Sequence, residues 1–304
     1  MEKFPQLLNQ KDSHGSTAMH YACKYNNTEV EKILLSHDNC QINVHDDEHQ
    51  NPLHYASKRG NLKYLLSLNC SVNVQDVNGK TPLHLASMYF NVEIIKELLQ
   101  RDGTLLNQQD KDGRTPLHCV FEDVGSYVTT RYETVSCLLN FPECDINLTD
   151  NKGNTPLHLA AWRLYDDDDD KILHLFIQRD GLLLNAENNM GQTALHLAAI
   201  HCNSEEIKVF LSHKECKTNA QDKNGYTPLH SCIQRGIYNE AIMNTIINLI
   251  KHDFSILNIK NNKGQTPLHV AVEEHELKVV DLLVRLGAEV NIKDNDNRTP
   301  LKLA

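Results

Sequence analysis

The amino-acid sequence predicts an all-α protein, a solenoid of stacked helix-turn-helix units. Two observations predict this class: a motif of the form Thr-Pro-Leu-His recurs along the whole chain, and the residues after each copy are apolar at helical spacing. In addition, turn-forming residues, glycine above all, precede most copies. Because a unit of two short helices cannot bury its apolar face alone, such units have to stack on one another.

The motif defines the repeat. Counted at its threonine, or at the residue in that place, the copies lie at residues 17, 51, 81, 115, 155, 193, 227, 266 and 299. In the third copy, Gly79-Lys80-Thr81 reads like the end of a phosphate-binding loop. The second glycine that such a loop needs five residues upstream is Val74, however, and lysine does not recur there in the other copies. We therefore interpret the stretch as part of a structural repeat.

Each copy predicts the start of a first helix. Thr81 is suited to the N-cap, and Pro82 to the first helical position, where its missing N–H costs nothing. Leu83, Leu85 and Ala86 then give that helix an apolar, small-residue face toward neighbouring units. A second helix follows, as in residues 92–101, where apolar residues recur on one side.

The segment that joins one unit to the next predicts a tight turn. Most copies contain Asp-x-x-Gly or a close variant, and glycine supplies the positive φ that the turn needs. His49 and Asn297 stand where glycine is usual. Both residue types tolerate the left-handed region better than most, so we expect these two turns to be intact.

A period near 33 residues with the signature Thr-Pro-Leu-His-x-Ala is similar to the ankyrin repeat. The resemblance covers nearly the whole chain. It implies one continuous domain over residues 1–304, an ankyrin-repeat solenoid of about nine units with β-hairpin turns. The last unit stops at Ala304, inside its first helix, which favours a fragment of a longer chain over a minimal cap.

Three long intervals predict insertions, near residues 122–134, 163–171 and 236–246. Loops tolerate extra length at small entropic cost, so we expect these segments to bulge from the stack as surface decoration. The second insertion contains five aspartates, Asp166 to Asp170. They lack the ligand spacing of a calcium loop, and we interpret them as a solvated acidic loop ahead of a helix near Lys171, with docking of a basic partner as the alternative.

Composition narrows the function classes. A formal charge of −10 argues against nucleic acid and anionic membranes as partners, and the sequence has neither a signal peptide nor an apolar run long enough to span a membrane. Nine cysteines at irregular spacing fit neither a disulfide framework nor a zinc ribbon. We interpret the cysteines as small buried apolar residues in a reducing compartment. We expect a cytoplasmic location, with the nucleus left open.

The recurring motif histidine invites a metal hypothesis. The eight copies are His20, His54, His84, His118, His158, His196, His230 and His269. On adjacent helices they would lie about a helix-packing distance apart, far beyond the ~2 Å ligand distance of one zinc ion. We expect each to form a hydrogen bond that joins its helix to the neighbouring hairpin. The sequence also lacks a nucleophile elbow and a dinucleotide fingerprint, so we expect no catalysis, no cofactor and no metal.

The resemblance implies that a partner would bind along a concave groove. The contacts would come from the hairpin tips and from the two variable residues that follow the pair of small residues in each first helix. Large and basic residues recur at these places, of the types enriched at binding hot spots. We expect a protein partner with an acidic segment to contact them, and a monomeric array. The predicted contact residues are Tyr25, Lys58, Arg59, Lys80, Met88, Tyr89, Arg114, Trp162, Arg163, Tyr226 and Arg235.

Two function classes stay open at this point. The first is an intracellular binding module, acting as a scaffold, an adaptor or an inhibitor that masks its partner. The second is a regulatory ankyrin region of a larger channel, kinase or other enzyme whose active domain lies outside this chain. A reading frame that continues past Ala304 would favour the second class.

Overall fold

The computed structural model describes residues 7–60, 70–122, 129–163, 169–201, 204–235 and 240–304. The chain divides into two compact units, Met1–Asn151 (unit 1) and Lys152–Ala304 (unit 2). All regular secondary structure in the described ranges is helical, which confirms the predicted all-α class.

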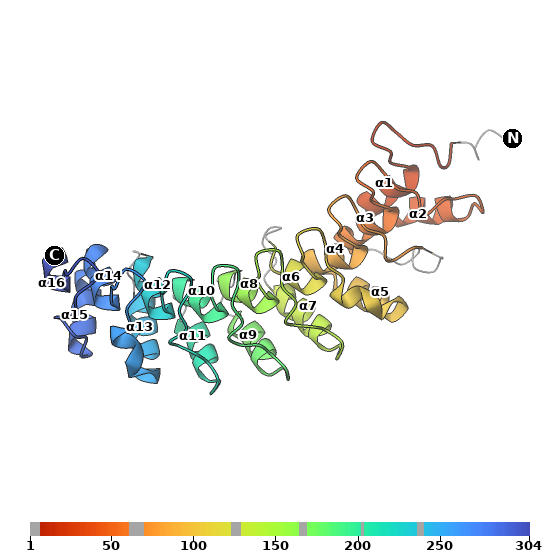
Figure 1. Ribbon diagram of the computed structural model, residues 1–304. Helices are drawn as coiled ribbons and strands as arrows, with labels where there is room; N and C mark the ends of the chain where they lie inside the picture. Colours follow the sequence, from red (N-terminus) through yellow and green to blue (C-terminus); the bar gives the residue numbers. More distant parts are fainter. Residues whose placement is uncertain (1–6, 61–69, 123–128, 164–168, 202–203, 236–239) are drawn as a thin grey trace. The chain divides into compact units, whose positions relative to one another are not determined.

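Unit 1 contains the first and the second helices of successive repeats. α1, α3, α4 and α6 begin at successive motif copies and contact one another in chain order, while α2 packs on α1 and α5 packs on α4 and α7 (Figure 1). Their bounds are α1 Ala18–Lys24, α2 Thr28–Leu35, α3 Pro52–Arg59, α4 Pro82–Met88, α5 Val92–Arg101, η2 Gly103–Asn107, α6 Pro116–Cys119 and α7 Thr129–Leu139.

Unit 2 has the same alternation. Its first helices, α8, α10, α12 and α14, form one row and its second helices, α9, α11, α13 and α15, form another (Figure 1). The bounds are α8 Pro156–Arg163, α9 Asp169–Ile177, α10 Ala194–His201, α11 Ser204–Leu211, α12 Pro228–Gln234, α13 Glu240–His252, η3 Phe254–Asn258, α14 Pro267–Glu273, α15 Leu277–Arg285 and α16 Pro300–Leu303.

The motif starts the first helices as predicted. In α4, Thr81 is the N-cap with Pro82 at the first position, and the side chains of Thr81 and His84 form a capping box. Leu83 and Ala86 are fully buried behind it. Burial of one such leucine contributes about 2 kcal/mol, and the small alanine lets the neighbouring helix approach closely.

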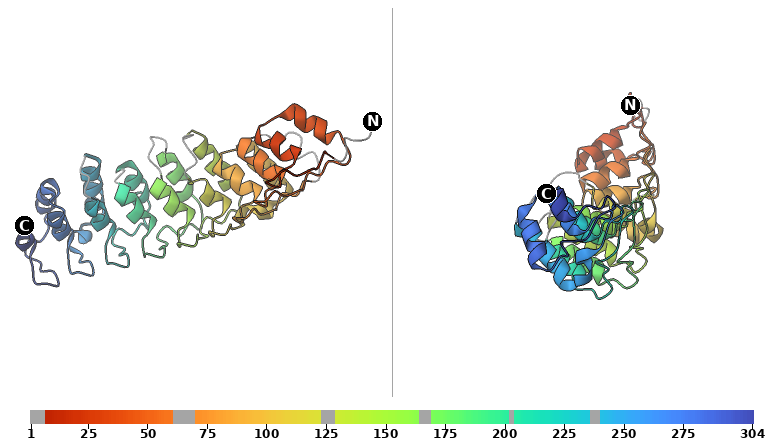
Figure 2. Two further views of the ribbon diagram at one scale, coloured as in Figure 1. Left: turned by 90° about the horizontal axis from the view of Figure 1, so that it is seen from above. Right: turned by 60° about the vertical axis from the view of Figure 1, so that its left-hand side comes forward.

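The turns between successive repeats form the hydrogen bonds of a hairpin, but their arms do not extend into strands. In one turn, the Asp110 N–H donates to the Arg114 carbonyl at 2.9 Å, and the Gly113 N–H donates to the Asp110 carbonyl at 3.0 Å. The turns of unit 2 project on the same side of its helices (Figure 2). The predicted β-hairpins are thus tight turns whose arms are too short to be strands in the described residues.

The positions without glycine adopt the predicted conformation: His49 has φ 57° and Asn297 has φ 60°. At Gly79 the backbone itself requires glycine. Its φ is 78°, and a Cβ atom there would lie 2.8 Å from the Lys111 nitrogen of the next turn.

The motif histidines form the hydrogen bonds that we predicted. The Nε2 atom of His84 donates to the Arg114 carbonyl in the next turn at 3.0 Å, and its Nδ1 accepts from the Thr81 N–H at 3.1 Å. Since a carbonyl can only accept, this bond fixes the Nε2–H tautomer. His20, His54, His158, His196, His230 and His269 bond to the next turn in the same way. Each histidine therefore fastens its repeat to the following one.

The predicted insertions fall partly outside the described residues. This applies to residues 123–128, to 164–168 with Asp166, and to 236–239. Where the insertions are described, they are largely helical: residues 129–134 belong to α7, residues 169–171 to α9, and residues 240–246 to α13. The third insertion thus lengthens a second helix, and α9 begins at Asp169, two residues before the predicted start.

Candidate interaction surface

The predicted contact residues lie at the C-terminal ends of the first helices and at the turn residue before each N-cap. We call this surface the first-helix face of each unit. Tyr25, Tyr89 and Trp162 are exposed, with 69%, 39% and 39% of their surface accessible. Arg59 and Arg235 are exposed, while Lys58, Met88, Arg114, Arg163 and Tyr226 are half-buried.

In unit 1, the ends of α1 and α3 bring together two lysines and two tyrosines. We call Tyr21, Lys24, Tyr55 and Lys58 the tyrosine-lysine patch. The Lys24 Nζ atom lies 5.9 Å from the ring centroid of Tyr21 and 6.0 Å from that of Tyr55, and the Lys58 Nζ atom lies 5.3 Å from the Tyr55 centroid. These distances are those of cation–π contacts. Tyr25 extends the patch by stacking on Tyr21, with centroids 6.2 Å apart.

The two patch tyrosines are held in place by turn carboxylates. The Tyr21 hydroxyl donates to Asp12 Oδ2 at 2.6 Å, and the Tyr55 hydroxyl donates to Asp46 Oδ2 at 2.7 Å. Sequence reasoning missed both tyrosines, although each stands four residues after its capping position and three before its lysine. That spacing places tyrosine and lysine on one helix face and was the available signal.

Lys80 and Arg114 behave differently from the other predicted contacts. Lys80 is buried, and its Nζ lies 2.6 Å from Glu122 Oε1; the Arg114 guanidinium lies 2.8 Å from the same oxygen. We call Lys80, Asp110, Arg114, Cys119 and Glu122 the Glu122 cluster. Two of the predicted partner-binding cations are therefore neutralised within unit 1.

The Glu122 cluster also contains the one group of described residues that could hold a metal ion. Ligand atoms of Asp110, Cys119 and Glu122 lie within 4.8 Å of one another. The Lys80 ammonium is already among them, at 3.7 Å from Asp110 Oδ2, 3.7 Å from Cys119 Sγ and 2.6 Å from Glu122 Oε1. Burial raises the pKa of the Cys119 thiol well above its usual range, so a metal thiolate is disfavoured. The lysine supplies the positive charge that a cation would bring.

In unit 2, Trp162 packs edge-on against His201, with ring centroids 4.4 Å apart. The Arg235 guanidinium donates to the Ile200 carbonyl at 2.7 Å, at the end of the same helix. Burial and, second, the charge of Arg235 lower the pKa of His201 to about 4. At neutral pH the exposed tryptophan thus lies beside a neutral imidazole and close to an arginine. Arg163 ends α8 and Tyr226 precedes the cap of α12.

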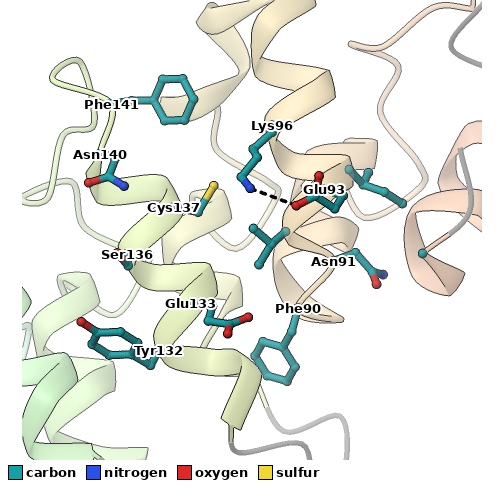
Figure 3. Close-up of a pocket in the computed structure, with 13 residues that line it drawn as sticks. Phe90, Asn91, Glu93, Lys96, Tyr132, Glu133, Ser136, Cys137, Asn140 and Phe141 are labelled. Atoms are coloured by element: carbon teal, nitrogen blue, oxygen red, sulfur yellow. Dashed lines mark hydrogen bonds and ion pairs between the residues drawn. The ribbon is translucent and has the colours of Figure 1, made fainter.

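A pocket lies on the opposite side of unit 1, between the second helices α5 and α7 (Figure 3). Its volume is about 780 Å³. Phe90 and Tyr132 stand at one end and Phe141 at the other, while Lys96 and Glu93 form an ion pair of 2.9 Å along the α5 wall. Burial raises the pKa of the Cys137 thiol in its wall, so this cysteine is a poor nucleophile.

Two further predictions from the sequence concern the state of the cysteines and the lack of a membrane-spanning segment. Seven of the described cysteines are buried and Cys40 is half-buried, all with free thiols, as predicted for small apolar residues. None of the helices in the described ranges combines the length and the apolar character that crossing a membrane requires.

Comparison with known proteins gives concordant matches. A family model described as "Ankyrin repeats (3 copies)" matches residues 2–76, 60–127 and 133–247, and one described as "Ankyrin repeats (many copies)" matches residues 249–304. The solved ankyrin repeat domain of Bcl-3, a member of the IkappaB protein family, is similar with a TM-score of 0.60 and 26% identity, over 75% of this chain and 95% of that one.

Curated relatives match about half of the chain. NF-kappa-B inhibitor alpha of Sus scrofa is 38% identical over 146 residues, 47% of this chain and 45% of the relative. A probable serine/threonine-protein kinase of Dictyostelium discoideum is 33% identical over 164 residues, 53% of this chain and 18% of the kinase. The alignments thus span less than half the length of either relative.

Proposed function

Since the chain belongs to the ankyrin repeat family, we propose that it is a protein-interaction module, not an enzyme, that binds its partner through the first-helix face. One observation carries this proposal: large exposed side chains recur at the C-terminal ends of the first helices, with Tyr25 and Tyr89 in unit 1 and Trp162 in unit 2. Exposed tyrosine and tryptophan bury large areas with few rotatable bonds when a partner docks.

The likeness to NF-kappa-B inhibitor alpha favours one form of this function. That relative is by name an inhibitor of another protein, so we propose that this chain masks its partner. Scaffold and adaptor roles would use the same face but would leave the partner accessible to third proteins.

Site-specific photocrosslinking tests the surface. A benzophenone amino acid is placed at Tyr89 or Trp162, and at Ile33 as the control, because Ile33 is 61% exposed but lies on the second helix α2. We expect a covalent partner adduct from Tyr89 and Trp162 and none from Ile33. Adducts of equal yield from Ile33 would show that the first-helix face is not the interface.

A further inference from the structure

We propose that the tyrosine-lysine patch at the ends of α1 and α3 anchors an acidic segment of the protein partner. This inference rests on the proposed function and names the chemistry of one contact. It identifies Lys24, Tyr21 and Tyr55 as recognition residues beside the predicted Tyr25, Lys58 and Arg59.

In the part of the chain that the structure describes, Lys24 and Arg59 have no carboxylate within ion-pair distance. The Lys58 ammonium donates to the neutral Gln50 amide at 3.1 Å. Burial, ahead of the neighbouring charges, lowers the pKa of Lys58. A partly desolvated ammonium interacts more strongly with an incoming carboxylate than a fully hydrated one does.

Two aspartates near the patch already accept hydrogen bonds within the chain. Asp46 uses one carboxylate oxygen to accept the Glu48 and Gln50 N–H groups and the other to accept the Tyr55 hydroxyl. Asp12 is used in the same way by its own turn and by Tyr21. Both carboxylates are therefore committed to holding the turn and the tyrosine ring. The exposed Glu48 acts on Lys58 at longer range, without an ion pair.

The side chains of the patch are preorganised by their contacts within the chain. The hydroxyl bonds fix both rings, and the rings position the ammonium groups of Lys24 and Lys58 above them. Less side-chain entropy is then lost when a carboxylate docks, which raises affinity for the same contacts.

The geometry also limits the spacing of the acidic residues. Both ammonium groups lie within 6.0 Å of the Tyr55 centroid, at 6.0 Å and 5.3 Å, so they are no more than about 11 Å apart. An extended segment rises about 3.3 Å per residue. Two carboxylates at alternate positions, about 6.6 Å apart on one side of such a segment, fall within that limit.

The test uses a short fluorescein-labelled peptide of alternating glutamate and leucine, with the glutamine-leucine peptide as its uncharged match. Fluorescence anisotropy with the full chain should show that the glutamate peptide binds about tenfold more tightly. The double variant Lys24→Met, Lys58→Met, which keeps the apolar stems, should abolish that preference. The matched control is Lys32→Met, Lys96→Met, with the same charge change on the second helices α2 and α5.

Three results would overturn the inference: equal binding of the two peptides, equal loss in the control variant, or tighter binding of an oligothymidine of similar length. The last result would assign the patch to phosphate backbones instead of acidic protein. None of these results affects the photocrosslinking readout at Tyr89 and Trp162, so the failure of this inference and the failure of the proposed function can be told apart.

Discussion

The tyrosine-lysine patch and the Glu122 cluster occupy the same repeat positions, yet they use their charges in opposite ways. The position seven residues after the cap is occupied by Lys24 and Lys58 in the patch and by Glu122 in the cluster. The position one residue before the cap is occupied by the neutral Ser16 and Gln50 beside the patch and by the cations Lys80 and Arg114 in the cluster.

The difference shows that side chains at these two positions reach each other. Lys58 donates to Gln50 and Arg114 donates to Glu122, in each case eight residues apart, and Gln265 and Glu273 repeat the pairing in unit 2. An opposite charge at the second position neutralises the first within the chain. A neutral residue leaves the charge available to a partner. A charged residue at one of these positions thus either stabilises the array or is available for recognition, depending on the residue at the other position.

The largest effect that this comparison predicts is on stability. Glu122→Gln removes the carboxylate that Lys80 and Arg114 share and leaves them only the longer contacts to Asp110 and Asp112, at 3.7 and 3.8 Å; breaking a buried pair costs several kcal/mol. Because the Glu122 side chain is 18% exposed, we expect a smaller loss of about 2 kcal/mol in the free energy of unfolding, measured by urea denaturation. In Glu273→Gln, where the partner is the neutral Gln265, the loss should be well under half as large. Equal losses would remove the distinction between the two kinds of pair.

The pH dependence of that loss sharpens the assignment. Burial opposes ionisation of Glu122, but Lys80 and then Arg114 outweigh it and hold the pKa of the carboxyl below its ordinary value. The contribution of a carboxylate with a lowered pKa is complete above the unfolded-state pKa and is lost as the pH falls through the folded-state pKa. The stability gap between the wild type and Glu122→Gln should therefore be constant near neutral pH and close below about pH 4. A gap that does not change with pH would mean that charge is not its cause.

An intermediate effect is expected at the anchored rings. Tyr55→Phe removes the hydroxyl that donates to Asp46 Oδ2 and leaves that buried oxygen without its partner. We expect a loss of about 1 kcal/mol in unfolding free energy, together with weaker binding of the glutamate-leucine peptide because the ring under Lys24 and Lys58 is less fixed. Unchanged peptide affinity in this variant would argue against preorganisation by the hydroxyl.

The smallest predicted effect converts the patch toward the pattern of the cluster. Ser16→Glu places a carboxylate eight residues before Lys24, and we expect the glutamate-leucine peptide to bind about threefold more weakly, the worth of one exposed ion pair. Ser16→Gln, of the same size without the charge, is the control and should bind like the wild type. If both variants weaken binding equally, the cause is steric.

The fold was predictable because its signals are local and repeated. The cap at Thr81, the proline after it and the histidine bonds all follow from the recurring motif, and His49 shows that the turn survives without glycine. The site was less predictable. The register located Tyr89 and Trp162 at the surface, but it could not show that Lys80 turns toward Glu122 of the next repeat, because that depends on side-chain direction across a repeat boundary. The ion pair between Arg114 and Glu122 was nevertheless predictable from the sequence, because these residues lie eight positions apart within one repeat.

The bonds of the motif histidines have a consequence for how such a sequence changes over generations. Each of the seven motif histidines described above bonds to the turn of the very next repeat. A crossover that deletes or duplicates one whole repeat joins a histidine to another turn with a carbonyl at the same place, so no bond is orphaned. Repeat number is therefore free to drift, while the residues on the first-helix face are reshuffled with it. Heritable change in the number of repeats is then a direct route to a new binding surface on an unaltered backbone.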